Sequence, residues 1–160
     1  EDKLAPESML HYHVEPFEGA HISQRSLEVT DIRPDHPFRF AVTETAMLKA
    51  LSAEILEKCK AYRCRKAVLV GHNAPFDLTF MQAAYRRADL AAMDPFHRFV
   101  TLDTATMSGL WLRETVLAKA MLRRGVTFDV AQAHSALYDC EKTAELFCGI
   151  VNEMDQIRGF

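Results

Sequence analysis

Ala67-Val68-Leu69-Val70-Gly71-His72-Asn73-Ala74-Pro75-Phe76-Asp77 is the stretch that decides the fold. Its first five residues form a short apolar run rich in β-branched side chains, which predicts a buried strand in a sheet covered on both faces. Pro75 suits the first turn of a helix, which we expect to continue to about residue 88. Ligands of open α/β sheets bind beyond the carboxyl ends of the strands, so the segment 72–77 holds candidate site residues.

Strands and helices alternate on both sides of this stretch. The other expected elements are, in chain order, a half-buried strand at 10–15, a short helix at 23–30 within an irregular segment 16–42, a helix at 44–60 with Thr43 as its N-cap, a strand at 99–103, and helices near 104–110, 115–124 and 134–155. This alternation indicates an α/β fold with a central sheet flanked by helices.

The composition is that of an ordinary globular protein. The chain has 160 residues, 49% of them hydrophobic, and a net charge of −3, so we expect a single domain over 1–160. No stretch reaches the roughly 20 apolar residues of a membrane span. The charge argues against a uniformly basic protein but allows a local basic patch. Four cysteines without a C-x-x-C pair predict reduced thiols in a cytoplasmic protein.

Three carboxylates follow apolar elements in a way that predicts a shared site. Asp77, Asp103 and Asp139 each have a structural explanation when taken alone, as a helix cap or a surface residue. Placed together at one edge of a sheet, they would repel one another unless a cation neutralised them. Carboxylate oxygens favour Mg²⁺ or Mn²⁺, and a pair of such ions suits attack on a phosphodiester.

His134 is the candidate general base of this site, because a neutral imidazole accepts a proton from water near pH 7. On one helix, His134 and Asp139 would be separated by roughly 140°. The two side chains can therefore meet only if His134 lies on the loop before the last helix.

The blocks His72-Asn73-Ala74-x-Phe76-Asp77 and His134-x-Ala136-x-x-Asp139 resemble the second and third motifs of the DEDD exonuclease superfamily, in its histidine-containing branch. Within that branch the chain resembles the ribonuclease T family over essentially its whole length. The blocks that carry this closer resemblance are His11–Ala20, Asp94–Phe99 and Gln132–Asp139.

The resemblance implies a ribonuclease H-like exonuclease fold with a central mixed sheet. It also implies a homodimeric, metal-dependent 3′→5′ exoribonuclease that trims the 3′ ends of tRNA and other stable RNAs, and that also digests single-stranded DNA. Its complete active site would hold two Mg²⁺ or Mn²⁺ ions. By this resemblance Asp77 and Asp139 are metal ligands, His134 is the general base close to the metal, and Asp103 is a further acidic residue of the site.

The resemblance also assigns nucleic-acid contacts. Phe76 and Phe99 match positions on which terminal bases stack, although the residues alone favour core aromatics. His72 and Asn73 belong to the same motif and are counted with them. The candidate basic patch, which could instead be a solvated helix end with favourable cations, is Lys58, Lys60, Arg63, Arg65 and Lys66, with Arg86-Arg87 a weaker candidate.

Two departures from the family pattern stand out. Arg25 and Val29 occupy positions where the family carries a Glu and a Phe that sense the terminal base, so tolerance for a 3′-terminal C is open. The first motif, Asp-x-Glu on an N-terminal strand, is absent from the chain. We therefore expect a domain that is incomplete at its N-terminus and inactive as 160 residues alone. The alternative is a non-catalytic RNA-binding or dimerisation module.

Overall fold

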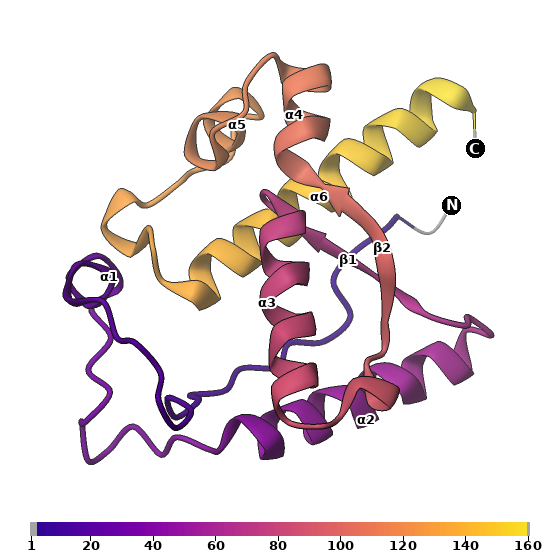
Figure 1. Ribbon diagram of the computed structural model, residues 1–160. Helices are drawn as coiled ribbons and strands as arrows, with labels where there is room; N and C mark the ends of the chain where they lie inside the picture. The colour runs from indigo at the N-terminus through magenta and orange to yellow at the C-terminus, as the bar shows by residue number, and fades with distance from the viewer. Residues whose placement is uncertain (1–2, 160) are drawn as a thin grey trace. The chain divides into compact units, whose positions relative to one another are not determined.

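The computed structural model describes residues 3–159 (Figure 1). Helices dominate the described chain, with two strands between them. In chain order the elements are α1 (Gln24–Thr30), α2 (Glu44–Ala61), β1 (Ala67–Gly71), α3 (Ala74–Arg87), the 3₁₀ turn η1 (Ala91–Met93), β2 (Phe96–Asp103), α4 (Thr104–Leu112), α5 (Leu117–Arg123), the 3₁₀ turn η2 (Val130–Gln132) and α6 (Ala136–Arg158).

The predicted α/β class and most predicted elements are confirmed. β1 has the predicted bounds, and the Thr43 side chain caps α2 by accepting a hydrogen bond from the Ala46 N–H at 3.2 Å. β2 begins at Phe96, three residues earlier than predicted, and α6 extends to Arg158. β1 and β2 pair in parallel, with α3 between them along the chain, and their arrowheads point to the same end in Figure 1.

The predicted strand at 10–15 is wrong. This segment makes one isolated bridge, in which Val42 donates to the His13 carbonyl at 2.8 Å and accepts from the Glu15 N–H at 2.9 Å. The facing segment is too short for a ladder, because Phe40 is left-handed (φ 48°) and Thr43 already begins the cap of α2. Among the described residues, the alternating segment 10–15 therefore has no extended strand beside it with which to form a ladder.

The expectation that β1 is covered on both faces is also wrong for the described residues. Across residues 3–159 the sheet has two strands, and Val68 in β1 is 39% exposed. On β2, Val100 and Leu102 are exposed to a similar degree. An apolar β-branched run predicts a strand reliably, but whether both faces are covered depends on segments elsewhere in the chain.

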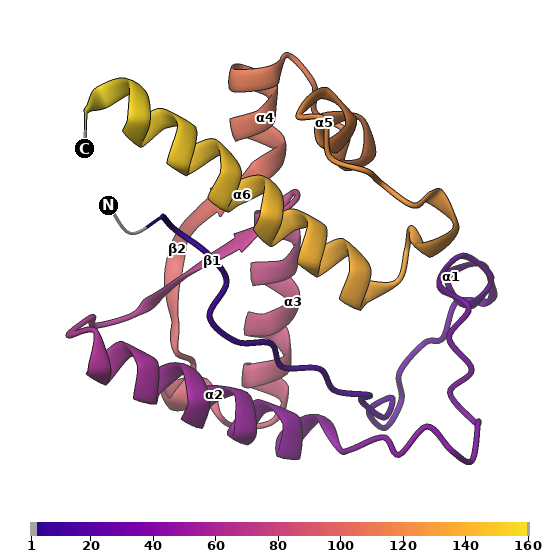
Figure 2. The ribbon, with the colours of Figure 1, turned by 180° about the vertical axis from the view of Figure 1, so that it is seen from behind.

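The described chain divides into two compact units. The first unit consists of residues 3–9, 68–78 and 99–159. Its core is formed where α4, α5 and α6 pack together, as both views of the ribbon show (Figures 1 and 2). The fully buried side chains at its centre are Ala120, Met121, Leu146 and Ile150. The site-bearing start of α6 therefore belongs to a helix anchored in this core.

The second unit consists of residues 10–67 and 79–98. Leu48 of α2 and Tyr85 of α3 are its largest buried side chains. The hydroxyls of Tyr85 and Ser52 share a buried hydrogen bond of 2.7 Å, which satisfies both polar groups. No helix of the described residues is long and apolar enough to cross a membrane.

Arg124, at the end of α5, is held against α6. Its guanidinium pairs with Glu153 at 2.9 Å, and the other Glu153 oxygen accepts from the Trp111 indole of α4 at 2.7 Å. Gly149 provides the space, because a Cβ there would collide with Nη2 of Arg124 and lie 2.6 Å from its Cζ. One carboxylate thus links three helices of the first unit.

We expect Gly149→Ala to lower the free energy of unfolding by about 1–2 kcal/mol, measured by urea titration. The displaced guanidinium loses its charged hydrogen bond, which outweighs the ~1 kcal/mol that Ala gains over Gly in a helix. In an Arg124→Ala background the same change should raise stability by about 1 kcal/mol, because only helix propensity remains. Stabilisation by Gly149→Ala in both backgrounds would contradict this account.

Candidate active site

The turn between β1 and α3 is tightly packed. A Cβ on Gly71 would lie 3.1 Å from both the Ala74 Cα and the Asp77 Oδ2, so this position accepts only glycine without local movement. The His72 ring is bonded on both sides, through Nδ1 to the Thr104 hydroxyl at 2.9 Å and through Nε2 to the Thr115 carbonyl at 2.8 Å. His72 thus ties this turn to α4 and to the segment before α5.

Asp103 joins the ends of the two strands. Its Oδ1 accepts from the backbone N–H of Asn73 at 2.7 Å, and Asn73 is left-handed with φ 71°. The same side chain caps α4 through the N–H groups of Ala105 at 3.3 Å and Thr106 at 3.0 Å, and it accepts from the Thr106 hydroxyl at 2.5 Å. The capping role that the sequence allowed for Asp103 is therefore present.

Hydrogen bonding favours the ionised form of Asp103. Partial burial opposes ionisation, but the donors of Thr106, Asn73 and Ala105 together outweigh it and lower the pKa of the carboxyl. The group contributes stability at pH values above the unfolded carboxyl's pKa of 3.8, and this contribution is lost as the pH falls toward the lowered folded value.

Asp77 lies in the first turn of α3, as predicted, beside Gly71 and Ala74. Desolvation raises its pKa above the ordinary value of 3.8, and a hydrogen bond with its own backbone opposes the rise. The Asp77 carboxyl therefore affects stability in the opposite direction with pH to that of Asp103. Its contribution to stability is present at low pH and is lost as the pH rises through its raised pKa. A carboxylate disfavoured as a bare anion is suited to binding a cation.

His134 lies before α6 rather than on it, which is the placement that allows it to meet Asp139. Its backbone is left-handed (φ 72°), its side chain is exposed, and its N–H donates to the Asp139 Oδ2 at 3.2 Å. Asp139 is half-buried in the first turn of α6. The structure thus brings a histidine and a carboxylate five residues apart to one point.

Asp77 lies close to the same end of α6. Burial raises the pKa of the Cys140 thiol, and the negative charges of Glu141 and Asp77 raise it further. Cys140 follows Asp139 directly, so the Asp77 carboxylate acts electrostatically on the first turn that carries Asp139. Sequence reasoning did not include Cys140 in this region, because a lone helical cysteine carries no spacing signal.

The donor set fits a hard divalent cation in type but is incomplete in number. Asp77 and Asp139 offer carboxylate oxygens, which Mg²⁺ and Mn²⁺ prefer. Across residues 3–159, however, no three His, Cys, Asp or Glu side chains gather closely enough to hold a metal ion. Asp103 does not add a ligand to this pair, since both of its oxygens accept hydrogen bonds from the protein.

The two candidate stacking residues are exposed. Phe76 lies in the first turn of α3, next to Asp77, and is 58% exposed. Phe99, on β2, is 79% exposed. Burial in the core, the alternative for both residues, does not occur in the described structure. Large exposed aromatic rings such as these are candidates for contact with a ligand.

The candidate basic patch lies in the second unit, around the end of α2. Lys60, Arg63 and Arg65 are exposed, and the Lys66 ammonium donates to the Asp94 carbonyl. Arg87, part of the weaker candidate, is used within the fold, since it pairs with Glu44 and lies 3.8 Å from the centre of the Phe17 ring. The positive charges most accessible to a ligand are therefore those of the 60–65 segment.

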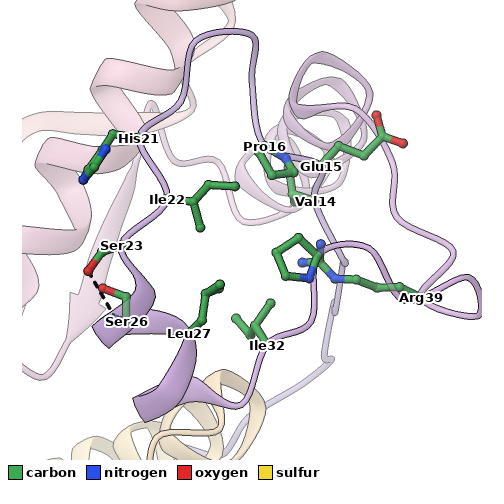
Figure 3. A pocket seen from close by; sticks show the side chains of 11 residues that line it. Val14, Glu15, Pro16, His21, Ile22, Ser23, Ser26, Leu27, Ile32 and Arg39 are labelled. Atoms are coloured by element: carbon green, nitrogen blue, oxygen red, sulfur yellow. Dashed lines mark hydrogen bonds between the residues drawn. The ribbon is translucent and has the colours of Figure 1, made fainter.

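The second unit also contains a cavity of about 330 Å³ (Figure 3). Ile22, Leu27 and Ile32 point into it, with Ser23 and Ser26 of the α1 cap along one side. Arg25 and Val29, the two departures from the family pattern, are not among its lining residues. Val29, on α1, is instead 52% exposed.

Several residues that shape the site were missed by sequence reasoning. Thr104 and Thr115 position His72, and Gly71 allows the close approach of Asp77. Of these, Gly71 alone carries a local signal, because a glycine between a strand and a polar turn suggests close backbone contact. The threonines are ordinary turn and helix-start residues, and their partners are distant in sequence.

We expect Asp103→Asn to lower the free energy of unfolding at pH 7 by about 1–2 kcal/mol, through loss of the charged cap. Urea titrations at several pH values should also show a smaller loss of stability below pH 4 than the unchanged protein shows, since the titrating carboxyl is gone. Asp35→Asn, on an exposed loop, controls for net charge. If the stability of Asp103→Asn falls below pH 4 as much as that of the unchanged protein, the Asp103 carboxylate does not have this capping role.

Comparisons with known proteins agree with this geometry. The sequence profile of the family described as Exonuclease matches residues 2–147. Ribonuclease T of Vibrio vulnificus (strain YJ016) is 52% identical over 158 residues, which is 98% of this chain and 72% of that protein. Ribonuclease T of Vibrio parahaemolyticus is 50% identical over 161 residues, which is 100% of this chain and 75% of that protein. That of Enterobacter sp. (strain 638) is 49% identical, covering 98% and 70%.

These matches confirm the family resemblance read from the motif blocks. The observed mixed α/β arrangement, with parallel β1 and β2 and their helices, agrees with the ribonuclease H-like fold of exonucleases. The chain belongs to the exonuclease family, close to the ribonuclease T proteins, and is a nuclease of the hydrolase class.

Proposed function

We propose that this chain carries catalytic residues of a metal-dependent 3′→5′ exoribonuclease that trims the 3′ ends of tRNA and other stable RNAs. The observation that carries the proposal is the 3.2 Å hydrogen bond from the His134 backbone N–H to the Asp139 carboxylate, which fixes the backbone of an exposed histidine beside that carboxylate. Asp77 lies within electrostatic range of the same helix turn. In a chain of the exonuclease family, these groups are the ones that phosphodiester hydrolysis needs.

Asp77 and Asp139 would hold the metal through carboxylate oxygens, with His134 beside them. When bound, two Mg²⁺ or Mn²⁺ ions would supply positive charge to the attacking and leaving oxygens of the phosphodiester. The described residues contribute fewer ligands than such a pair requires. We therefore retain the prediction that residues 1–160 alone bind metal weakly and do not cut.

His134 acts on the water in this proposal. The imidazole accepts a proton from water as the water oxygen attacks phosphorus. The bond from phosphorus to the 3′-oxygen of the preceding nucleotide breaks, and that oxygen takes a proton from solvent. The products are a nucleoside 5′-monophosphate and an RNA shorter by one residue. The exposed position of His134 on a loop leaves its ring accessible to substrate water.

Substrate binding would use stacking and charge. Phe76 and Phe99 offer exposed faces to terminal bases, at about 1–3 kcal/mol for each stacked base, without reading sequence. His72 and Asn73 would contribute from the turn before Phe76. In a cytoplasmic homodimer, the basic run of one subunit would guide RNA toward the partner's site; this run is Lys58, Lys60, Arg63, Arg65 and Lys66. The two subunits together could then bind an RNA strand that is longer than the site of one subunit.

We expect 5′-labelled RNA with a 3′ overhang to shorten in one-nucleotide steps only when Mg²⁺ or Mn²⁺ is present. The assay uses the longest natural polypeptide containing these residues, with residues 1–160 run in parallel. His134→Ala should lower kcat by about 10²–10⁴-fold, because the proton acceptor is lost. Asp139→Asn should remove activity while RNA binding persists.

His11→Ala, an exposed histidine in the second unit, is the control and should retain full activity. Cutting that persists after His134→Ala or Asp139→Asn would reject these roles. RNA binding without cutting under every metal condition would favour the non-catalytic RNA-binding module instead.

Charge reversal in the basic run gives an independent test of RNA binding. We expect Lys60→Glu with Arg65→Glu to weaken single-stranded RNA binding most at low salt, measured by fluorescence anisotropy. The slope of log Kd against log salt should fall by about 0.7 for each phosphate that the protein no longer neutralises. Arg158→Glu, on α6, is the matched control. An unchanged affinity would favour the alternative interpretation, in which the basic run is a solvated helix end that does not bind RNA.

A further inference from the structure

The loop that carries His134 is held at its two ends by α6. We call residues 129–135 the histidine loop; it contains the turn η2 and ends at Ser135, the N-cap of α6. The Ser135 side chain makes no capping hydrogen bond. The usual anchor of a helix start is therefore missing from the end of the loop that carries the histidine.

Tyr138 and Asp139, neighbours on α6, provide the anchors instead. The Tyr138 hydroxyl oxygen accepts from the Asp129 N–H at 2.6 Å, at the start of the loop. The Asp139 Oδ2 accepts from the His134 N–H at 3.2 Å, near its end. The loop is thus closed as a ring on the first turn of α6, with one anchor at Asp129 and the other at His134 itself.

Tyr138 is well placed to be the rigid anchor. It is 9% exposed, and its ring meets the edge of Phe128 with centroids 5.2 Å apart. Phe128 packs against the core of the first unit, and the Lys142 ammonium lies 5.6 Å from the centre of the Tyr138 ring. The hydroxyl therefore cannot follow the loop if the loop moves.

The histidine loop needs such an anchor because its conformation is costly. His134 is left-handed, a region that side chains with a Cβ populate at a cost of roughly 1–2 kcal/mol. Its neighbours Val130, Gln132 and Ser135 are exposed, so burial adds little to the loop's stability. Within the loop, the Asp129 side chain accepts from the Ala131 N–H at 2.9 Å and from the Gln132 side-chain amide at 2.8 Å, and these two bonds hold η2 without reaching His134.

We propose that Tyr138 is a positioning residue that sets the place of the His134 imidazole relative to Asp139. The inference rests on the proposed function of His134 and names the group through which α6 controls it. Loss of the hydroxyl releases the Asp129 end of the loop, so that His134 samples other positions. The fraction of molecules competent for proton transfer then falls, while the exposed stacking residues remain in place.

The test compares Tyr138→Phe with the unchanged protein, by amide hydrogen exchange on residues 1–160 and by kinetics on the longest natural polypeptide that contains them. We expect the Asp129 and His134 amides to exchange about tenfold faster, with Leu146 and Ile150 amides of the α6 core as internal references. We expect kcat for RNA to fall about tenfold with KM within twofold of the original value. In a His134→Ala background, Tyr138→Phe should have no further effect on kcat.

Tyr85→Phe is the matched control, because it also removes a buried tyrosine hydroxyl bond, to Ser52 in the second unit. It should leave both the loop amides and kcat unchanged. Unaltered exchange at Asp129 and His134 in Tyr138→Phe would overturn the proposal, as would an equal fall of kcat in Tyr85→Phe. Exchange requires no cleavage, so a chain that cuts no RNA still tests the anchor independently of the proposed function.

Discussion

The bond from the Asn73 N–H to the Asp103 carboxylate is the interaction on which the site most depends. It connects the turn after β1 to the end of β2, and the same carboxylate begins α4. Because the turn is fixed, Gly71 and Asp77 approach closely and Phe76 is presented beside them. Without this carboxylate, the N–H groups of two turns would lack their acceptor in a partly buried place.

The two halves of the candidate site are built in the same way. A left-handed polar residue, Asn73 or His134, precedes each helix, and its N–H donates to a carboxylate. Each helix then carries an aspartate in its first turn, Asp77 in α3 and Asp139 in α6. The left-handed residue turns the chain sharply, so that the aspartate points back toward the end of the preceding segment. A common local solution thus serves two distant parts of the chain.

Stability and candidate function are separated within the first unit. The Arg124–Glu153–Trp111 group and the buried core hold α4, α5 and α6 together, and none of these residues is one of the exposed residues of the site. His134, Phe76 and Phe99 are exposed and add little to packing. A rigid helix that carries an exposed loop is a common arrangement for sites that must both hold their geometry and admit a substrate.

Local pattern determined much of this protein: the apolar run of β1, the helix starts at Thr43 and Asp103, and the two motif blocks that predicted Asp77, His134 and Asp139 as neighbours. The strand and the helix starts follow from short-range chemistry, namely periodicity, capping and turn preference, whereas the motif blocks rest on resemblance to a family and their site residues stay a prediction. Tertiary structure decided what depends on distant partners. Within the described part of the chain, residues 10–15 form no strand because Phe40 and Thr43 leave Val42 as their one pairing partner. The bonds of His72 to Thr104 and Thr115, and of Tyr138 to Asp129, join residues whose spacing carries no periodic signal, so only the folded chain reveals them.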